Sequence, residues 1–243
     1  MKSPNLRPAT GFSLVELLVV ILIIVTLAAI SVMGFSRIRS AGDQATTIAV
    51  MRQLQVANIS YSTENNGQYV QIAELDENDS LAMEWYKNPK FLAHLTGDPS
   101  VFEKKGNELL KAPTGSLDPV AFRAKKKDYD RLTASFGINA EGLSWPKKHS
   151  DPPMSYKVSQ VENPSRTAFL VTAVNYQVKH SGRNLWKTAP VEGKVTTDKM
   201  AFRHNAKAVV VYYDGSSGLV SYDDIARFDA NGGAANPFWK AKK

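Results

Sequence analysis

Residues 12–36 read FSLVELLVVILIIVTLAAISVMGFS, and this stretch decides how the chain is organised. From Leu17 to Ser36 there is no charged residue, and most positions are Leu, Val, Ile or Ala. A helix of about 20 residues rises about 30 Å, the thickness of the hydrocarbon core of a bilayer. Because residues 37–243 are polar, the sequence predicts one membrane-spanning segment followed by one soluble domain.

The composition of the 243 residues excludes several classes of protein. With 43% hydrophobic and 22% charged residues, the chain is neither disordered nor collagen-like. It contains no cysteine, which excludes a disulfide framework, a Cys-based zinc site and a Cys nucleophile. The net charge is +7, and without Lys2 and Arg7 of the first 11 residues it is +5. This weakly basic balance predicts no specific binding of nucleic acid.

Three hypotheses account for the apolar run. A cleaved secretory signal fits the basic start and Ala28-Ala29, but the run exceeds the about 7–15 apolar residues of such signals. An ordinary signal anchor explains the length but not the carboxylate of Glu16. In the third hypothesis the leader is cut before the apolar run, which then stays on the mature protein.

The third hypothesis depends on residues 7–17, RPATGFSLVEL. A glycine, an aromatic residue and a glutamate stand in register at Gly11, Phe12 and Glu16, ahead of the apolar run. The segment resembles the prepilin peptidase site of type IV pilins and type II secretion pseudopilins. The resemblance implies cleavage between Gly11 and Phe12 by prepilin peptidase, N-methylation of Phe12, and a role for Glu16 in the axial register of a filament.

Glu16 has a physical meaning in this interpretation. An ionised carboxylate near hydrocarbon is costly, so it finds a partner or takes up a proton. After the cut, the ammonium of Phe12 lies one helical turn from Glu16 in the same chain. Glu16 pairs either with this ammonium or, in an assembly, with the ammonium of a neighbouring subunit. The resemblance favours the neighbouring subunit. The alternative is a glutamate stabilised by the macrodipole at a helix N-terminus.

The predicted helix continues past the membrane as an amphipathic segment, 37–64. Phe12 to Glu64 contain no proline, and Asn65-Asn66-Gly67 form a plausible stop. The sequence therefore predicts one helix of about 50 residues, whose first half lies in the membrane and whose second half packs on the soluble domain, 65–243. Apolar residues at steps of three or four mark the packed face: Ile38, Ala41, Ala45, Ile48, Met51, Leu54, Ala57 and Tyr61.

The soluble domain begins with a variable stretch, 65–133, in which 80–95 resembles a helix broken near Pro89. The second half predicts β structure. Runs of β-branched and aromatic residues at 135–139, 167–173 and 207–213 are bounded by turn residues. Residues 214–218 predict a hairpin turn and 219–222 the returning strand.

A second resemblance involves this β region. His204 is followed by nine residues and then by Asp214-Gly215, 135–139 read SFGIN, and 163–167 read NPSRT. These motifs resemble the prepilin-type processing-associated H-X9-DG proteins, a pseudopilin-like group, although Ser216, Ser217 and Gly218 extend the turn. His204 and Asp214 lie near the two ends of one predicted strand, about 33 Å apart if it is straight, so they cannot touch unless the chain bends before Ala206. A structural role as cap, turn or sheet edge is the first hypothesis, followed by metal or ligand binding and then catalysis.

Other candidate sites are weaker. Asp214, Asp223 and Asp224 offer oxygen ligands for calcium, which the resemblance to major pseudopilins makes a possible cofactor; the alternative is turn and surface aspartates. No recognisable nucleophile, base and orienter set occurs, so we expect no enzyme. Phe238 or Trp239 is expected to tie the C-terminal tail to the domain, and Trp145 belongs either to a contact surface or to the cover of the sheet.

Together these observations predict an α+β, pilin-like protein: a long N-terminal helix packed on a small antiparallel sheet. The expected function is that of a pseudopilin or minor pilin, a structural subunit of a type II secretion-like or type IV pilus-like filament. Expected partners are prepilin peptidase, other pilin-like subunits, secreted cargo and the inner membrane, with the C-terminal domain periplasmic or extracellular. The alternative is a membrane-anchored binding module for polysaccharide, DNA or secreted protein.

Overall fold

The structure of the chain, a computed structural model, describes residues 13–103, 111–113, 115–123, 132–180 and 200–241. The chain divides into two compact units, Met1–Gly42 and Asp43–Lys243. Helix α1 (Leu14–Glu64) belongs to both, and it ends at the residue where the sequence predicts a stop. The long helix and the sheets of the second unit confirm the α+β class.

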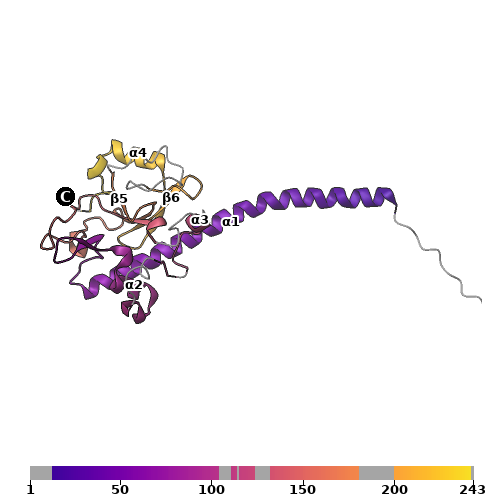
Figure 1. The fold of residues 1–243 in the computed structure, drawn as a ribbon. Helices are drawn as coiled ribbons and strands as arrows, with labels where there is room; N and C mark the ends of the chain where they lie inside the picture. The colour runs from indigo at the N-terminus through magenta and orange to yellow at the C-terminus, as the bar shows by residue number, and fades with distance from the viewer. Residues whose placement is uncertain (1–12, 104–110, 114, 124–131, 181–199, 242–243) are drawn as a thin grey trace, which may run out of the picture. The chain divides into compact units, whose positions relative to one another are not determined.

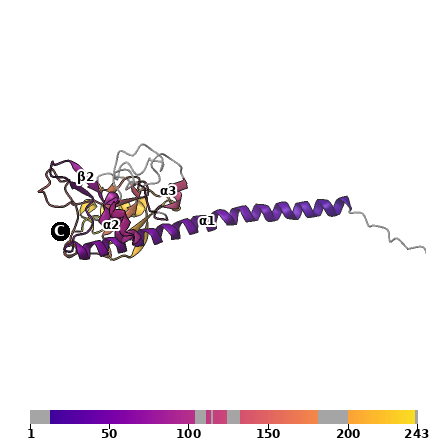
Figure 2. The ribbon, with the colours of Figure 1, turned by 60° about the horizontal axis from the view of Figure 1, so that its bottom comes forward.

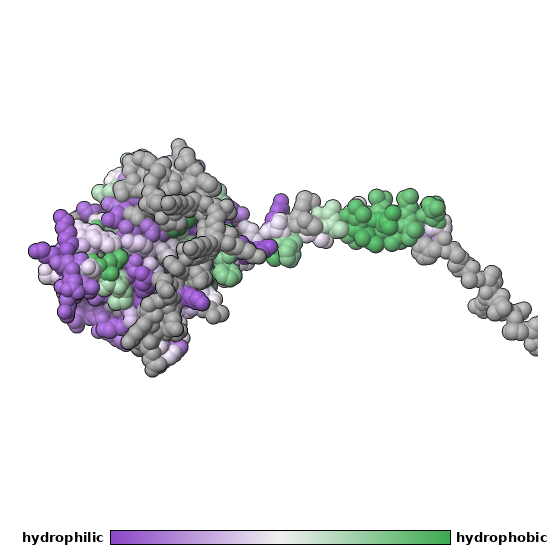
Figure 3. Space-filling model, viewed as in Figure 1, coloured by the Kyte–Doolittle hydropathy of each residue, from purple (hydrophilic) through white to green (hydrophobic). Residues whose placement is uncertain are grey.

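In the first unit, α1 carries a continuous apolar surface. Figure 3 shows this surface in green along the N-terminal part of the helix. The most apolar window of α1 has none of its residues buried within the chain. The hydroxyls of Thr26 and Ser31 donate to the carbonyls of Ile23 and Leu27, so the helix satisfies them internally. Within the described residues, α1 is the one helix long and apolar enough to cross a membrane.

The second unit is built on a five-stranded sheet. All neighbouring strands are antiparallel except β3 and β5, which are parallel. The expectation of a purely antiparallel sheet is therefore wrong at one edge, because the chain crosses over between β3 and β5 instead of forming a hairpin. A separate antiparallel pair joins β1 (Ala73–Leu75) to β2 (Leu81–Glu84). The order across the five-stranded sheet is β5 (Gln177–Val178), β3 (Phe136–Asn139), β4 (Ala168–Thr172), β6 (Lys207–Tyr212) and β7 (Ser217–Ser221).

Apolar cores cover both faces of the sheet. Val209 and Val211 of β6 join the core that contains Met51 and Leu54 of α1. Their neighbour Val210 joins the core on the other face, which contains residues of α4 (Tyr222–Ala230). In Figure 1, α4 and the C-terminal half of α1 lie on opposite sides of the sheet. Because successive side chains of a strand point to opposite faces, a strand buried on both faces must be apolar throughout.

Buried polar side chains fix the C-terminal half of α1 on the sheet. The amide of Gln55 donates to the carbonyl of Tyr213, which follows β6. Asn58 donates to Gln55 at 3.1 Å and accepts the backbone N–H of Val70 at 3.0 Å. Since a buried amide without these partners is costly, the contacts set the register of the helix along the sheet.

Two local predictions need correction. Residues 81–84 form β2 rather than helix, and Pro89 begins α2 (Pro89–Thr96) rather than breaking a longer helix. Asn88 accepts the N–H of Phe91 as the N-cap, and proline is compatible with the first helical position.

Ser217 and Gly218 lie in β7, so the hairpin loop is shorter than predicted. Figures 1 and 2 both show α2 beside the C-terminal half of α1, where His94 and Glu64 are 3.2 Å apart.

The remaining elements are short. Residues after β7 continue directly into α4, and the chain returns to the sheet through its last described residues. The short helices are η1 (Trp85–Lys87), η2 (Pro99–Glu103), α3 (Pro119–Arg123), η4 (Leu132–Ala134), η5 (Val158–Gln160) and η7 (Gly233–Ala235).

Candidate functional site

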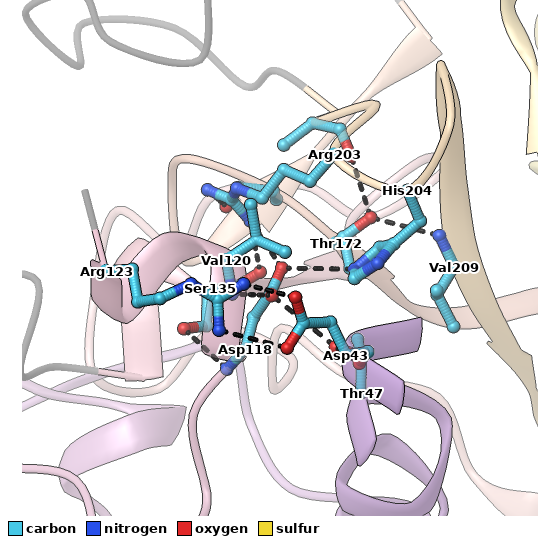
Figure 4. Close-up of polar contacts among 12 residues, drawn as sticks. Asp43, Thr47, Asp118, Val120, Arg123, Ser135, Thr172, Arg203, His204 and Val209 are labelled. Carbon is cyan, nitrogen blue, oxygen red and sulfur yellow. Dashed lines mark hydrogen bonds and ion pairs between the residues drawn. The ribbon is translucent and has the colours of Figure 1, made fainter. Parts of the chain in front are cut away.

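His204, singled out by its motif, lies in a buried polar cluster centred on Asp118 (Figure 4). Oδ2 of Asp118 lies 3.3 Å from Nη1 of Arg203 and 3.5 Å from Nε2 of His204. The hydroxyl of Thr47 in α1 reaches Oδ1 at 3.4 Å. The side chains of Asp118 and Arg203 are 0% exposed and that of His204 is 1% exposed. We call these four residues the Asp118 cluster.

Arg203 connects the cluster to three points of the backbone. Its guanidinium donates to the carbonyls of Ala134 at 2.8 Å, Ser135 at 3.0 Å and Ala173 at 2.9 Å. Ala134 and Ser135 precede β3, and Ala173 follows β4. The planar fork of donors in arginine suits such a set of fixed acceptors. One side chain thus joins the adjacent ends of two strands to the carboxylate of Asp118.

His204 reaches the cluster because the chain turns before β6. Asn205 and Ala206 have φ values of 51° and 57°, and His204 and Lys207 exchange two backbone hydrogen bonds of 3.0 Å. His204 and Asp214 are therefore not joined by one straight strand, because the chain bends at Asn205 and Ala206 and β6 begins at Lys207, as the sequence predicted for this strand. His204 pairs with Asp118, whereas Asp214 bonds to Ser216.

The electrostatics of the cluster favour an ionised Asp118. Burial opposes ionisation, but the hydrogen bond with His204 and the positive charge of Arg203 outweigh it and hold the pKa of Asp118 below its ordinary value of 3.8. The N–H of Val120 also donates to the carboxylate at 2.8 Å, as expected of the residue before α3. The carboxylate of Asp118 is thus a buried charge held by several donors, and its side chain is not exposed to solvent.

Asp214 and Gly215 shape the hairpin at the other end of β6. Gly215 has a φ of +85°, which favours glycine. Oδ1 of Asp214 accepts the N–H of Ser216 at 2.8 Å and its hydroxyl at 2.6 Å. The N–H of Asp214 donates to the carbonyl of Pro164, so the loop lies against the 163–167 segment. The first hypothesis for His204 and Asp214, a structural role, agrees with these contacts.

The 135–139 segment also has a structural explanation. The hydroxyl of Ser135 accepts the N–H of Asp118 at 3.1 Å. A Cβ on Gly137 would lie 2.5 Å from the carbonyl oxygen of Asn175, so no larger residue fits. Asn139 donates to the carbonyls of Ala168 and Trp239 at 3.0 and 2.7 Å.

The proposed calcium ligands have other partners. Asp224 forms a capping box with Ser221 at the start of α4 and pairs with Arg227. Asp223 is exposed in the first turn of α4. No group of three or more His, Cys, Asp or Glu side chains that could hold a metal ion occurs in the part of the chain that the structure describes. The calcium hypothesis gains no support from these residues.

At the N-terminus, Gly11 and Phe12 lie outside the described residues. Glu16 is exposed, and its Oε2 accepts the N–H of Ser13 at 2.8 Å. The hydroxyl of Ser13 accepts the N–H of Val15 at 3.3 Å. In the single chain, Glu16 therefore caps the first turn of α1, as its position near the positive end of the helix dipole allows.

Sequence reasoning missed Asp118 and Thr47. The pair Asp118-Pro119 is a signal for a helix start, with the acid as cap and the proline at the first helical position. Nothing local indicates that the same carboxylate meets Arg203 and His204, which are 85 and 86 residues away in sequence. Asp43 of α1 and Arg123 of α3 add a bidentate ion pair beside the cluster (Figure 4).

Comparisons with protein-family models, curated proteins and solved structures found no match for this chain. A functional conclusion must therefore come from the chain's own residues and their geometry.

Proposed function

We propose that this chain is a pilin-like structural subunit of a type II secretion-like or type IV pilus-like filament. One observation carries the proposal: α1 exposes a continuous apolar surface in its first half, yet its second half is part of a folded domain. An apolar helix of this length needs lipid or other apolar helices around it. A membrane-stored subunit that polymerises through its N-terminal helix supplies both surroundings.

Processing follows from residues 7–17. In this proposal the membrane inserts residues 12–36, the basic leader with Lys2 and Arg7 stays on the cytoplasmic side, and the domain lies in the periplasm or outside the cell. Prepilin peptidase cuts between Gly11 and Phe12, and the new N-terminus of Phe12 is methylated. The partners are the peptidase, the inner membrane, other pilin-like subunits and, for a secretion machine, its cargo.

Glu16 exchanges partners during assembly. In the single chain its carboxylate accepts one backbone hydrogen bond from Ser13, a contact whose loss costs about 1 kcal/mol. Beside the ammonium of a neighbouring Phe12, in apolar surroundings, the same carboxylate gains an opposite charge. The weaker capping contact therefore does not prevent docking, and it keeps the acid satisfied before assembly.

The domain has a mechanical rather than a catalytic role in this proposal. Its buried Asp118 cluster joins the start of α3 to the turn before β6, and Oδ1 of Asp118 lies 3.4 Å from the hydroxyl of Thr47 in α1. The ion pair between Asp43 and Arg123 adds a second connection to α1. Force applied to the helix would thus be transferred to the sheet through contacts at the start of its packed half.

The first test is intact-mass analysis of the membrane-extracted protein from cells with and without prepilin peptidase. We expect peptidase-dependent loss of residues 1–11 and the addition of one methyl group. The Gly11→Val variant should remain full length, whereas Glu16→Ala should be cut. A wild-type chain that is full length, or cut near Ala29, in the presence of the peptidase would contradict the proposal.

The second test measures assembly. Because the chain has no cysteine, a Val20→Cys variant can form disulfides only between copies, or with another subunit that carries a cysteine. Oxidation in membranes that contain the assembly machine should give a disulfide-linked dimer, because each copy carries one thiol. Adding Glu16→Ala should reduce the yield of dimer, and adding the matched change at exposed Glu77 should not. An anchored binding module without assembly would give no dimer with either variant.

A further inference from the structure

A groove of about 490 Å³ opens on the surface of the second unit, away from the Asp118 cluster in sequence. It lies between the 142–147 segment and the 151–160 segment. Its size is within the range of about 300–1,000 Å³ that small-molecule sites occupy. All of its lining residues belong to one compact unit, so the inference is independent of the proposed filament.

Trp145 is the exposed aromatic side chain of the groove. It is 40% exposed, whereas Trp85 and Trp239 are buried, at 1% and 0%. Tyr156, the other aromatic residue of the lining, is 5% exposed, and its hydroxyl donates to the carbonyl of Glu141 at 2.7 Å. The groove therefore presents one flat aromatic surface and not a pair of exposed rings.

The walls of the groove are held in place. A Cβ on Gly142, which has a φ of +76°, would lie 2.7 Å from the hydroxyl of Tyr156, so this wall depends on glycine. Oδ2 of Asp151 accepts the N–H groups of Lys147 and Lys148 at 2.7 and 3.0 Å. Prolines at positions 146, 152 and 153 restrict the backbone further. A ligand would lose little affinity to the ordering of such walls.

Polar side chains line the groove together with Trp145. Oε1 of Gln160 accepts the N–H of Lys157 at 2.8 Å, while its amide nitrogen has no partner among the residues that the structure describes. Within those described ranges, Oδ1 of Asp151 and the hydroxyl of Ser144 also have no hydrogen-bond partner, and the ammonium of Lys147 interacts electrostatically with Asp151. The lining thus offers both donors and acceptors, on atoms that are not used to hold the fold.

The chemistry of the lining selects among ligands. A pyranose ring has a flat C–H face for an indole and a rim of hydroxyls that both donate and accept hydrogen bonds. Single-stranded nucleic acid also stacks on tryptophan, but it needs a groove rich in Lys and Arg, and here Lys147 is balanced by Asp151. A proline-rich peptide needs an aromatic-lined groove, and Tyr156 is not exposed for it.

We propose that this groove binds a neutral β-linked glycan chain, with one sugar ring stacked on Trp145, because such a chain is extended and exposes the flat faces of its rings to an indole. Asp151 accepts hydrogen bonds from sugar hydroxyls, and Gln160 and Lys147 donate to them. The balanced charge of the lining favours neutral over acidic sugars. On a filament subunit or an anchored domain, the groove would bring the protein to cell-wall or extracellular polysaccharide.

The test is calorimetric titration of the full-length protein in a detergent without a sugar headgroup. The probes are cellohexaose, xylohexaose and chitohexaose, with decaproline and a single-stranded oligothymidylate for comparison. We expect wild type to bind at least one of the hexasaccharides more tightly than either comparison ligand. The proposal would be overturned if none of the three hexasaccharides binds. It would also be overturned if decaproline or the oligothymidylate binds more tightly than every hexasaccharide.

Three variants locate the binding. Trp145→Ala should weaken binding at least about tenfold, and Trp145→Phe, which keeps an aromatic face, should weaken it less. Phe122→Ala removes another exposed aromatic side chain, 57% exposed and outside the groove lining, and should leave binding unchanged. Circular dichroism and thermal unfolding of each variant show that it is folded. Unchanged glycan binding by folded Trp145→Ala would also overturn the proposal.

Discussion

Nη1 of Arg203 lies 3.3 Å from Oδ2 of Asp118, and neither side chain is exposed to solvent. The same guanidinium donates to three backbone carbonyls around β3 and β4. A buried ion pair is not by itself strong support for stability, because desolvation of both charges offsets their attraction. Removal of one partner is different, because it leaves the other charge buried and unpaired.

The first prediction concerns this pair. Asp118→Asn should lower the free energy of unfolding by about 3–5 kcal/mol, because Arg203 loses its counter-charge. Urea unfolding of the full-length protein in detergent, followed by tryptophan fluorescence, measures the change. Asp223→Asn is the control, because Asp223 is exposed and should change stability by less than about 0.5 kcal/mol. Equal effects of the two substitutions would show that the Asp118 cluster does not stabilise the domain.

The second prediction concerns acid. The pKa of Asp118 is lowered in the folded protein, so its contribution to stability is present above the unfolded value of 3.8 and is lost as the pH falls through the folded value. Between pH 5 and pH 2, the melting temperature of wild type should fall more than that of Asp118→Asn. The pKa values of Asp151 and Asp224 are also lowered, but both proteins retain these carboxylates, so their effect cancels. Parallel melting curves across this range would contradict the prediction.

The third prediction compares two glycines. At Gly137 an added Cβ would meet the carbonyl oxygen of Asn175 at 2.5 Å and the Cβ of Ala173 at 3.0 Å. Gly137→Ala should therefore lower the free energy of unfolding by about 1–3 kcal/mol. Gly42 lies inside α1 with nothing within 4 Å of its added Cβ, so Gly42→Ala should raise it by about 0.5–1 kcal/mol. Thermal unfolding of both variants measures the contrast, and a shift of both in the same direction would contradict it.

The helix and most strands were predictable because their signals are local. The apolar run and the spacing of Met51, Leu54 and Ala57 predict a helix with one packed face, and these three side chains are buried. The same prediction is wrong for Ile38, Ala41 and Ala45, which are exposed. The β-branched run before Asp214 predicts β6. Residues 80–95 were misassigned because Asn88-Pro89 starts a helix, whereas the preceding residues pair with β1 through contacts that a local pattern does not reveal.

The Asp118 cluster was not predictable for the opposite reason. Its members come from α1, the start of α3 and the turn before β6, so only the folded chain brings them together. The motif indicated that His204 matters but not its partner. The distance argument for His204 and Asp214 allowed for a bend before Ala206, and the structure has this bend at Asn205 and Ala206.

The C-terminal tail is tied to the sheet, as the sequence predicted for Phe238 or Trp239. Both side chains are buried, at 3% and 0% exposed. The amide of Asn139 in β3 donates to the carbonyl of Trp239 at 2.7 Å and to that of Ala168 in β4 at 3.0 Å. One side chain therefore links the tail to two central strands, in addition to the packing of the aromatic rings.

The fourth prediction follows from this link. Asn139→Ala should leave two buried carbonyls without their side-chain donor, at a cost of about 1–3 kcal/mol. Because the tail can detach without unfolding the sheet, the loss should appear as a local opening that speeds amide exchange of Trp239 and Lys240 by about 10- to 100-fold. Hydrogen exchange followed by mass spectrometry measures it, with the exposed Asn78→Ala as control. If Trp239 and Lys240 keep their protection in Asn139→Ala, the tail is held by its aromatic rings and by the backbone hydrogen bonds from Ala168 to Phe238 and from Glu162 to Ala241, without need of Asn139.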